Sequence, residues 1–131
     1  MNRQVLEQAL ECFADPARRQ QYFDVYAEDA VLTGHAGVAP GLANIRRYYE
    51  EFWAAFPDAQ IQLDELIENG DDIALRYTVT ATHQGPFLGI PASGRRIEIP
   101  SITTIRFRDG KCVQRWNTSS AHLLHEQISG L

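Results

Sequence analysis

Histidine, serine and threonine side chains are the groups in this sequence best placed to do chemistry. His83 lies between Thr82 and Gln84, and histidine is the side chain best suited to reversible proton transfer near neutral pH. A lone histidine at the end of a strand also commonly fixes a loop through a hydrogen bond, so both roles stay open. His35 begins a segment rich in glycine and proline, which indicates a loop that could cover the mouth of a pocket.

Two further sets of side chains repeat with a period of two residues. Ser101 and Thr103 form one set; the other is Gln114, Trp116, Thr118 and Ser120. Because alternate residues of a strand share a face, each set is predicted to line a cavity wall, with Trp116 and Trp53 as aromatic walls. Such hydroxyls hold ligand oxygens but supply no strong base. The alternatives are that serine and threonine merely populate the strands and that Trp53 packs in the core.

Several classes of function are disfavoured by composition and motifs. The net charge of −5 argues against nucleic acid, and no apolar run approaches the length of a membrane span. The histidine spacing predicts no metal site, and without a glycine-rich fingerprint or a GxSxG motif no organic cofactor is predicted. The first residues carry no signal segment, and Cys12 and Cys112 lie outside any CxxC motif. We therefore expect a cytoplasmic protein with two structural thiols.

The elements that must position these residues change from helical to strand periodicity near Pro57. Helices are predicted over 2–14, from Pro16 towards Ala27, over 42–56 and over 122–127. Strands are predicted over 30–33, 61–67 with a bulge at 64–65, 73–84, 95–108 and 111–118. One domain over 1–131 follows from the length. Helices followed by long antiparallel strands indicate an α+β fold in which a cone-shaped, curved sheet wraps around the N-terminal helices.

Three segments resemble the SnoaL-like polyketide cyclase family of the nuclear transport factor 2-like superfamily. The first runs from Gly41 to the Phe-Pro-Asp sequence that ends at Asp58. The second, Thr82-His83-Gln84-Gly85-Pro86-Phe87-Leu88-Gly89-Ile90-Pro91-Ala92-Ser93-Gly94-Arg95, is the most specific. The third joins Arg106 through Lys111 to Trp116-Asn117, Leu123-Leu124 and Gln127.

The resemblance implies an enzyme that cyclises or isomerises a hydrophobic, oxygenated small molecule without a cofactor, and it implies a homodimer. Family members often close rings by intramolecular aldol chemistry, with an aspartate four residues after the tryptophan as acid and base. That position is Ser120 here, and a hydroxyl cannot take a proton from carbon without an activating base. His83 and Ser120 are the catalytic candidates. The alternative is a binding or carrier protein that kept the pocket.

Overall fold

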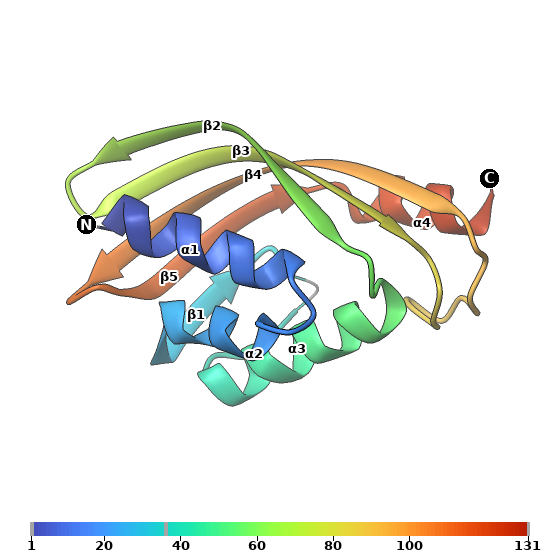
Figure 1. Cartoon of the computed structure of the whole chain (residues 1–131), viewed down its shortest axis with the longest axis horizontal. Coiled ribbons are helices and arrows are strands. Elements are labelled where there is room, and N and C mark those ends of the chain that lie inside the picture. Colours follow the sequence, from blue (N-terminus) through green and yellow to red (C-terminus); the bar gives the residue numbers. More distant parts are fainter. Residues whose placement is uncertain (1, 36, 131) are drawn as a thin grey trace.

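The computed structural model describes residues 2–35 and 37–130. Its elements are α1 (Asn2–Ala14), α2 (Arg19–Tyr22), the 3-10 helix η1 (Phe23–Val25), β1 (Tyr26–Thr33), α3 (Leu42–Ala55), β2 (Gln60–Asn69), β3 (Asp72–Thr82), β4 (Arg96–Arg108), β5 (Lys111–Ser119) and α4 (Ala121–Ser129). Figure 1 shows α1, α2 and α3 on one side of a curved sheet, with α4 at its far end. The predicted α+β fold is confirmed.

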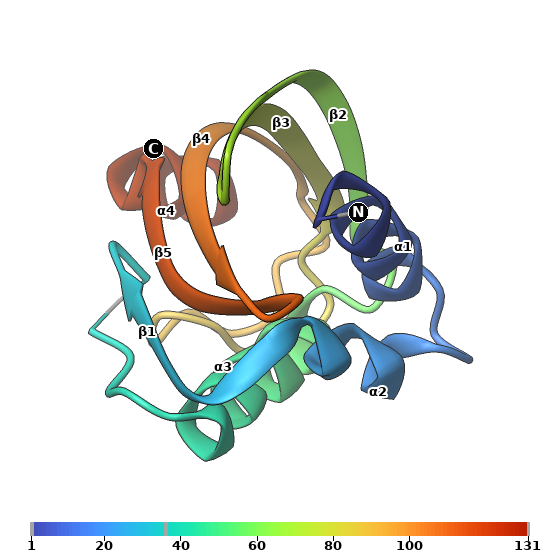
Figure 2. The same cartoon turned by 90° about the vertical axis from the view of Figure 1, so that its left-hand side faces the viewer.

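The sheet has the strand order β1-β5-β4-β3-β2. From β2 to β5 it is the predicted antiparallel meander, and the predicted bulge in β2 is present as a register shift between Leu63 and Glu65. β1 adds to it in parallel, against β5, which the period-two pattern did not predict. Strands of this length twist strongly, so the sheet curls without closing, and its hollow faces the helices (Figure 2).

Burial along β4 alternates without interruption. Its buried residues are Ile97, Ile99, Ser101, Thr103, Ile105 and Phe107. This face carries Ser101 and Thr103, which are predicted to line a cavity wall, while Glu98 on the other face is exposed. The pairing of β4 with β3 runs without a shift from Asp72 to Thr82. The central strands therefore present a regular inner surface.

The second predicted helix is wrong in length. Only α2 and η1 are helical, and β1 begins at Tyr26, four residues before the predicted strand. Tyr26, Ala30 and Leu32 are buried along β1. Tyrosine and valine fit a pleated surface at least as well as a helix, so the aromatic spacing of this short stretch did not distinguish the two structures.

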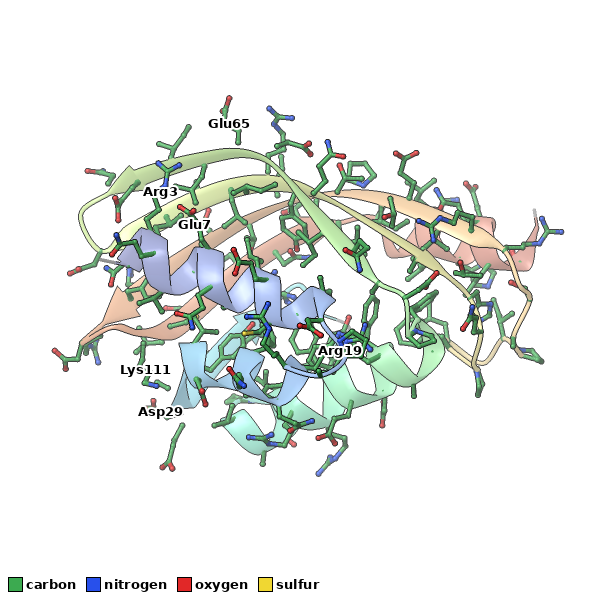
Figure 3. All side chains as sticks on the ribbon, viewed as in Figure 1. Arg3, Glu7, Arg19, Asp29, Glu65 and Lys111 are labelled. Atoms are coloured by element: carbon green, nitrogen blue, oxygen red, sulfur yellow. The ribbon has the colours of Figure 1, made fainter. Side chains whose placement is uncertain are left out.

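Arg19 of α2 connects α1 with the segment that follows α3 (Figure 3). Its Nε donates to the Phe13 carbonyl at 3.1 Å and its Nη2 to the Pro57 carbonyl at 2.6 Å. The guanidinium also lies 5.3 Å from the centre of the Trp53 ring, and Trp53 is 6% exposed. Trp53 therefore packs in the core between helices.

Two of the segments that carry the family resemblance meet at the end of α3. Asp58 accepts hydrogen bonds from the backbone N–H and the hydroxyl of Thr82, both at 2.7 Å. The Ala55 carbonyl accepts from the N–H groups of Gln84 (2.8 Å) and Gly85 (3.1 Å). A Cβ on Gly85 would lie 2.6 Å from the Ala54 carbonyl oxygen, so this approach requires glycine. These contacts fix the loop between β3 and β4 onto α3.

Within the described residues, no helix is long and apolar enough to cross a membrane. The same part of the chain holds no group of three or more histidine, cysteine, aspartate or glutamate side chains that could bind a metal ion. Cys12 and Cys112 are both buried and free.

Candidate active site

A cavity of about 120 Å³ lies between the concave face of the sheet and the helices. Its apolar wall includes Leu6, Phe13, Leu75, Ile97, Ile99 and Ile105. An engineered cavity of about 150 Å³ with comparable walls takes up benzene, so the enclosed space accepts about one aromatic ring. Ser119 lines the cavity and is exposed, so a longer ligand could extend to the surface there.

Arg115 of β5 points into this cavity and is 8% exposed. Its guanidinium is surrounded by hydroxyl groups from other elements. Nε donates to Thr103 Oγ1 (2.9 Å), Nη1 to the hydroxyls of Tyr49 (2.9 Å), Tyr26 (3.0 Å) and Tyr22 (3.3 Å), and Nη2 to the hydroxyl of Tyr77 (2.9 Å). We call these six residues the arginine–tyrosine cluster. A guanidinium stays protonated in proteins, so the cluster carries a full positive charge.

The cluster is assembled by long-range packing. Tyr22 ends α2 and Tyr26 begins β1, and the two hydroxyl oxygens are 2.6 Å apart. Tyr49 comes from α3 and Tyr77 from β3. Burial raises the pKa values of Tyr22, Tyr26 and Tyr77, an effect that the charge of Arg115 partly offsets. These three tyrosines are therefore neutral hydrogen-bonding groups at neutral pH.

His35 is buried and lines the cavity beside the cluster. Its Nε2 is 3.4 Å from the Tyr49 hydroxyl, and its buried Nδ1 has no hydrogen-bond partner among the described residues. Burial, with a further contribution from the charge of Arg115, lowers the pKa of His35 to about 3. The ring is therefore neutral. Burial likewise raises the pKa of the Cys112 thiol, which also lines the cavity, to about 11.

The predicted inward face of the last strand is wrong by one residue. The pairing of β4 with β5 moves from Phe107–Cys112 to Arg106–Gln114, which leaves Val113 as an extra residue. A bulge of this kind exchanges the two faces of a strand. After it, the inward side chains are Arg115, Asn117 and Ser119.

Gln114, Trp116 and Thr118 consequently do not line the cavity. The Trp116 ring lies 5.3 Å from the guanidinium of Arg106, an exposed residue on the other side of the sheet. Ser101 and Thr103 do line the cavity, as predicted.

The two catalytic candidates also lie outside the cavity lining. Ser120 caps α4, where its Oγ accepts from the N–H of Leu123 at 2.9 Å. His83 is fully buried, and its Nδ1 accepts from the Ser93 N–H (3.2 Å) and lies 2.8 Å from the Ser93 hydroxyl. Its ring packs 5.5 Å from that of Phe56. These contacts match the loop-fixing alternative for His83.

Sequence reasoning missed the arginine–tyrosine cluster. The predicted inward set of the last strand, Gln114, Trp116, Thr118 and Ser120, leaves Arg115 on the outward face, and no role is predicted for the tyrosines. One signal was available: the chain has five tyrosines, and four of them contact Arg115. A spacing argument cannot find such a cluster, because its members come from separate elements.

Comparisons with known proteins place this geometry in a family. The family model of SnoaL-like polyketide cyclases matches residues 4–128. AclR, a candidate hydroxylase from Streptomyces galilaeus, is 26% identical with a TM-score of 0.85, over 99% of this chain and 82% of AclR. IdmH, a candidate polyketide cyclase from Streptomyces antibioticus, is 26% identical with a TM-score of 0.82, over 98% of this chain and 99% of IdmH.

TsrD from Streptomyces laurentii is 27% identical with a TM-score of 0.80, and the match covers 100% of this chain and 99% of TsrD. A comparison with curated proteins found no match.

Proposed function

Because this chain belongs to the SnoaL-like polyketide cyclase family, we propose that it cyclises or isomerises a hydrophobic, oxygenated small molecule held in the cavity. A polyketide-like intermediate is the substrate class that the family suggests. The observation that carries the proposal is the arginine–tyrosine cluster, which places a positive charge and several hydroxyls inside an otherwise apolar space. Apolar walls bind the carbon skeleton, and the cluster orients its oxygens.

The chemistry fits a carbonyl oxygen placed against Arg115. In an intramolecular aldol addition, the α-carbon gives up a proton and bonds to a second carbonyl carbon, and the proton ends on the new alkoxide oxygen. The formula is unchanged and no further reactant is consumed. Negative charge develops on oxygen during this step, and preorganised donors in a dry site stabilise such charge strongly. Holding the chain in a folded conformer lowers the barrier further.

His35 is the proton acceptor that the cavity offers for this step. Its ring is neutral, and Nδ1 has no hydrogen-bond partner within the described part of the chain. In the proposed role Nδ1 is the unprotonated nitrogen, and the Nε2–H donates to the Tyr49 hydroxyl. Burial is the main cause of the low pKa of His35, and the charge of Arg115 adds to it. Negative charge that develops on a ligand oxygen beside Arg115 would offset this second contribution and so favour proton transfer to the ring. The proposed role of His35 is thus proton transfer, and that of Arg115 is oxyanion stabilisation.

A second function, binding without turnover, has one observation in its favour. Among the described residues, no aspartate or glutamate lines the cavity. The position at which the family resemblance implies an acid is Ser120, whose hydroxyl is engaged in capping α4. A carrier needs the pocket but not the base.

Turnover separates the two functions. Purified protein is incubated with a linear, phenyl-capped triketone. The mixture is followed by liquid chromatography with mass spectrometry, which separates isomers of equal mass, and by thermal denaturation. If the protein is an enzyme, it forms a cyclic isomer of the triketone, or the dehydrated form of that ring, faster than the uncatalysed reaction. The substitution Tyr49→Phe then lowers the rate. A carrier raises the melting temperature and returns the triketone unchanged. If the protein shows neither turnover nor an increase in melting temperature, both functions are contradicted.

A further inference from the structure

We infer that the cavity binds its ligand as an anion, with a carboxylate, phenolate or enolate oxygen against Arg115 and the tyrosine hydroxyls. The inference rests on the proposed function, because it names the chemical class of the molecule held at the same site. Within the cavity, the positive charge has no negative counterpart, and hydrogen-bond donors outnumber acceptors.

The charge of Arg115 has no counter-charge in its surroundings. All five of its hydrogen bonds go to neutral hydroxyl oxygens of the cluster, and Arg115 forms no ion pair with any of the described residues. A buried charge without a counter-charge carries a large desolvation cost. An anionic ligand removes this cost on binding, which a neutral ligand cannot do.

The guanidinium also has a donor left over. Arginine carries five N–H groups. The Nε–H goes to Thr103, the two Nη1–H groups are shared among three tyrosine hydroxyls, and one Nη2–H goes to Tyr77. Within the described chain the second Nη2–H has no acceptor. It is free to bind an oxygen of the ligand.

The tyrosine hydroxyls add a second spare donor. Tyr77 donates to Asn117 Oδ1 at 2.8 Å, and the Tyr49 hydroxyl faces His35 Nε2 at 3.4 Å. In the Tyr22–Tyr26 pair, one hydroxyl donates to the other, so one proton of the pair remains without an acceptor among the described residues. The cavity therefore offers donors in excess, and a ligand oxygen that carries negative charge accepts such hydrogen bonds best.

An anionic ligand also accounts for the chemistry of the lining. A carboxylic acid is already ionised at neutral pH, before it enters the site, and the positive charge of Arg115 favours ionisation of a bound 1,3-dicarbonyl compound or phenol. The protein then has no need of a carboxylate base in the cavity, and the described lining contains none. The site would select for ligands that are acidic and carry about one ring.

Three single-ring probes of similar shape test the inference on the wild-type protein. They are para-nitrophenol, para-nitrobenzoate and nitrobenzene, and their dissociation constants are measured by calorimetry. We expect para-nitrobenzoate to bind at least about tenfold more tightly than nitrobenzene. The visible band of phenolate reports the ionisation of bound para-nitrophenol, and its pKa should fall by at least about one unit on binding, the equivalent of a tenfold preference for the anion.

Variants assign this preference to Arg115. Arg115→Met should remove it, and Arg115→Lys should retain part of it because a charge remains. Arg76→Met is the matched control: Arg76 lies on the outer face of the sheet with a 54% exposed side chain, so its loss should leave all three affinities unchanged. If Arg115→Met does not fold, the comparison of the three probes on wild-type protein decides alone.

Each pattern of binding has one meaning. A preference for both anionic probes supports a general oxyanion site. A preference for the phenolate alone supports an enolate-like ligand, and one for the benzoate alone supports a carboxylate. Equal binding of nitrobenzene and para-nitrobenzoate, with no fall in the pKa of bound para-nitrophenol, would overturn the anion inference and leave the proposed small-molecule site standing. No binding of any probe would overturn both.

Discussion

At the residue scale, the protonation state of His35 has a measurable consequence for stability. Its pKa falls from 6.5 to about 3 in the folded protein, so below about pH 6.5 the unfolded chain binds a proton that the folded chain does not. The contribution of His35 to the free energy of unfolding is therefore fully present above pH 6.5. It is lost as the pH falls towards 3, by about 1.4 kcal/mol per pH unit.

The substitution His35→Gln tests this expectation, because a glutamine amide is not protonated in this pH range and offers both a donor and an acceptor to the Tyr49 hydroxyl. Urea denaturation at several pH values between 4 and 7 should show a shallower loss of the free energy of unfolding for the variant than for the wild type. His125→Gln, at an exposed position of α4, is the control and should follow the wild-type slope. Parallel slopes for His35→Gln and wild type would mean that His35 is protonated in the folded state.

The last strand shows what residue spacing can and cannot predict about the site. Ser101 and Thr103 were placed correctly because β4 alternates without interruption. Trp116 was placed wrongly because one extra residue, Val113, reverses the alternation of β5. No residue type near Val113 marks the bulge, since its position depends on the pairing with β4. Arg115 was missed for the same reason.

At the element scale, the family-like segments hold the fold together. The Phe-Pro-Asp end of α3 and the start of the loop after β3 meet through Asp58 and Thr82. The residues of these segments make structural contacts and do not line the cavity. The most specific motif in the sequence therefore predicted the fold well and the cavity poorly. His83 belongs to the same loop, held by Ser93.

Removal of the Asp58 charge tests this contact. Burial alone would raise the pKa of Asp58, but the hydrogen bonds from Thr82 and the charge of Arg96 outweigh it and lower the pKa. The ionised form thus stabilises the fold above the ordinary pKa of 3.8, and this contribution is lost as the pH falls below it. Asp58→Asn should lower the free energy of unfolding by about 1 kcal/mol at neutral pH, because the carboxylate is 40% exposed.

Urea denaturation at neutral pH and at about pH 3 measures the effect, which should shrink at the lower pH, where wild-type Asp58 is itself becoming protonated. Asp29→Asn is the control, since Asp29 is exposed and points away from the protein (Figure 3). A cost for Asp58→Asn that does not change with pH would show that the charge of Asp58 contributes nothing.

At the scale of the whole molecule, the order of helices and strands was predictable because long periodic segments dominate the second half of the chain. The parallel pairing of β1 with β5 was not, because it joins segments more than 80 residues apart, as in the pair Tyr26–Cys112. That pairing brings Tyr26 beside Arg115. The site therefore forms only when distant segments of the chain pair, and no local sequence pattern predicts that pairing.

The outer face of the sheet is where the homodimer expected from the family resemblance would form. Among the large apolar side chains, Ile67 and Ile102 are 59% and 55% exposed. Ile102 is paired with Arg76 and Thr118 on the side opposite the cavity. Burial of an isoleucine side chain contributes about 1.5–3 kcal/mol, so Ile102 would contribute to a dimer of this face.

The substitution Ile102→Lys should therefore weaken a dimer by at least about tenfold, since it places two lysines near the symmetry axis and removes the apolar contact. Sedimentation equilibrium over a range of protein concentrations measures the change. Leu88→Lys makes the same kind of change at a side chain that is 47% exposed in the loop between β3 and β4, and it should leave the dissociation constant unaltered. Wild-type protein that sediments as a monomer would contradict the homodimer, and an equal effect of both substitutions would place the contact elsewhere than on the outer face of the sheet.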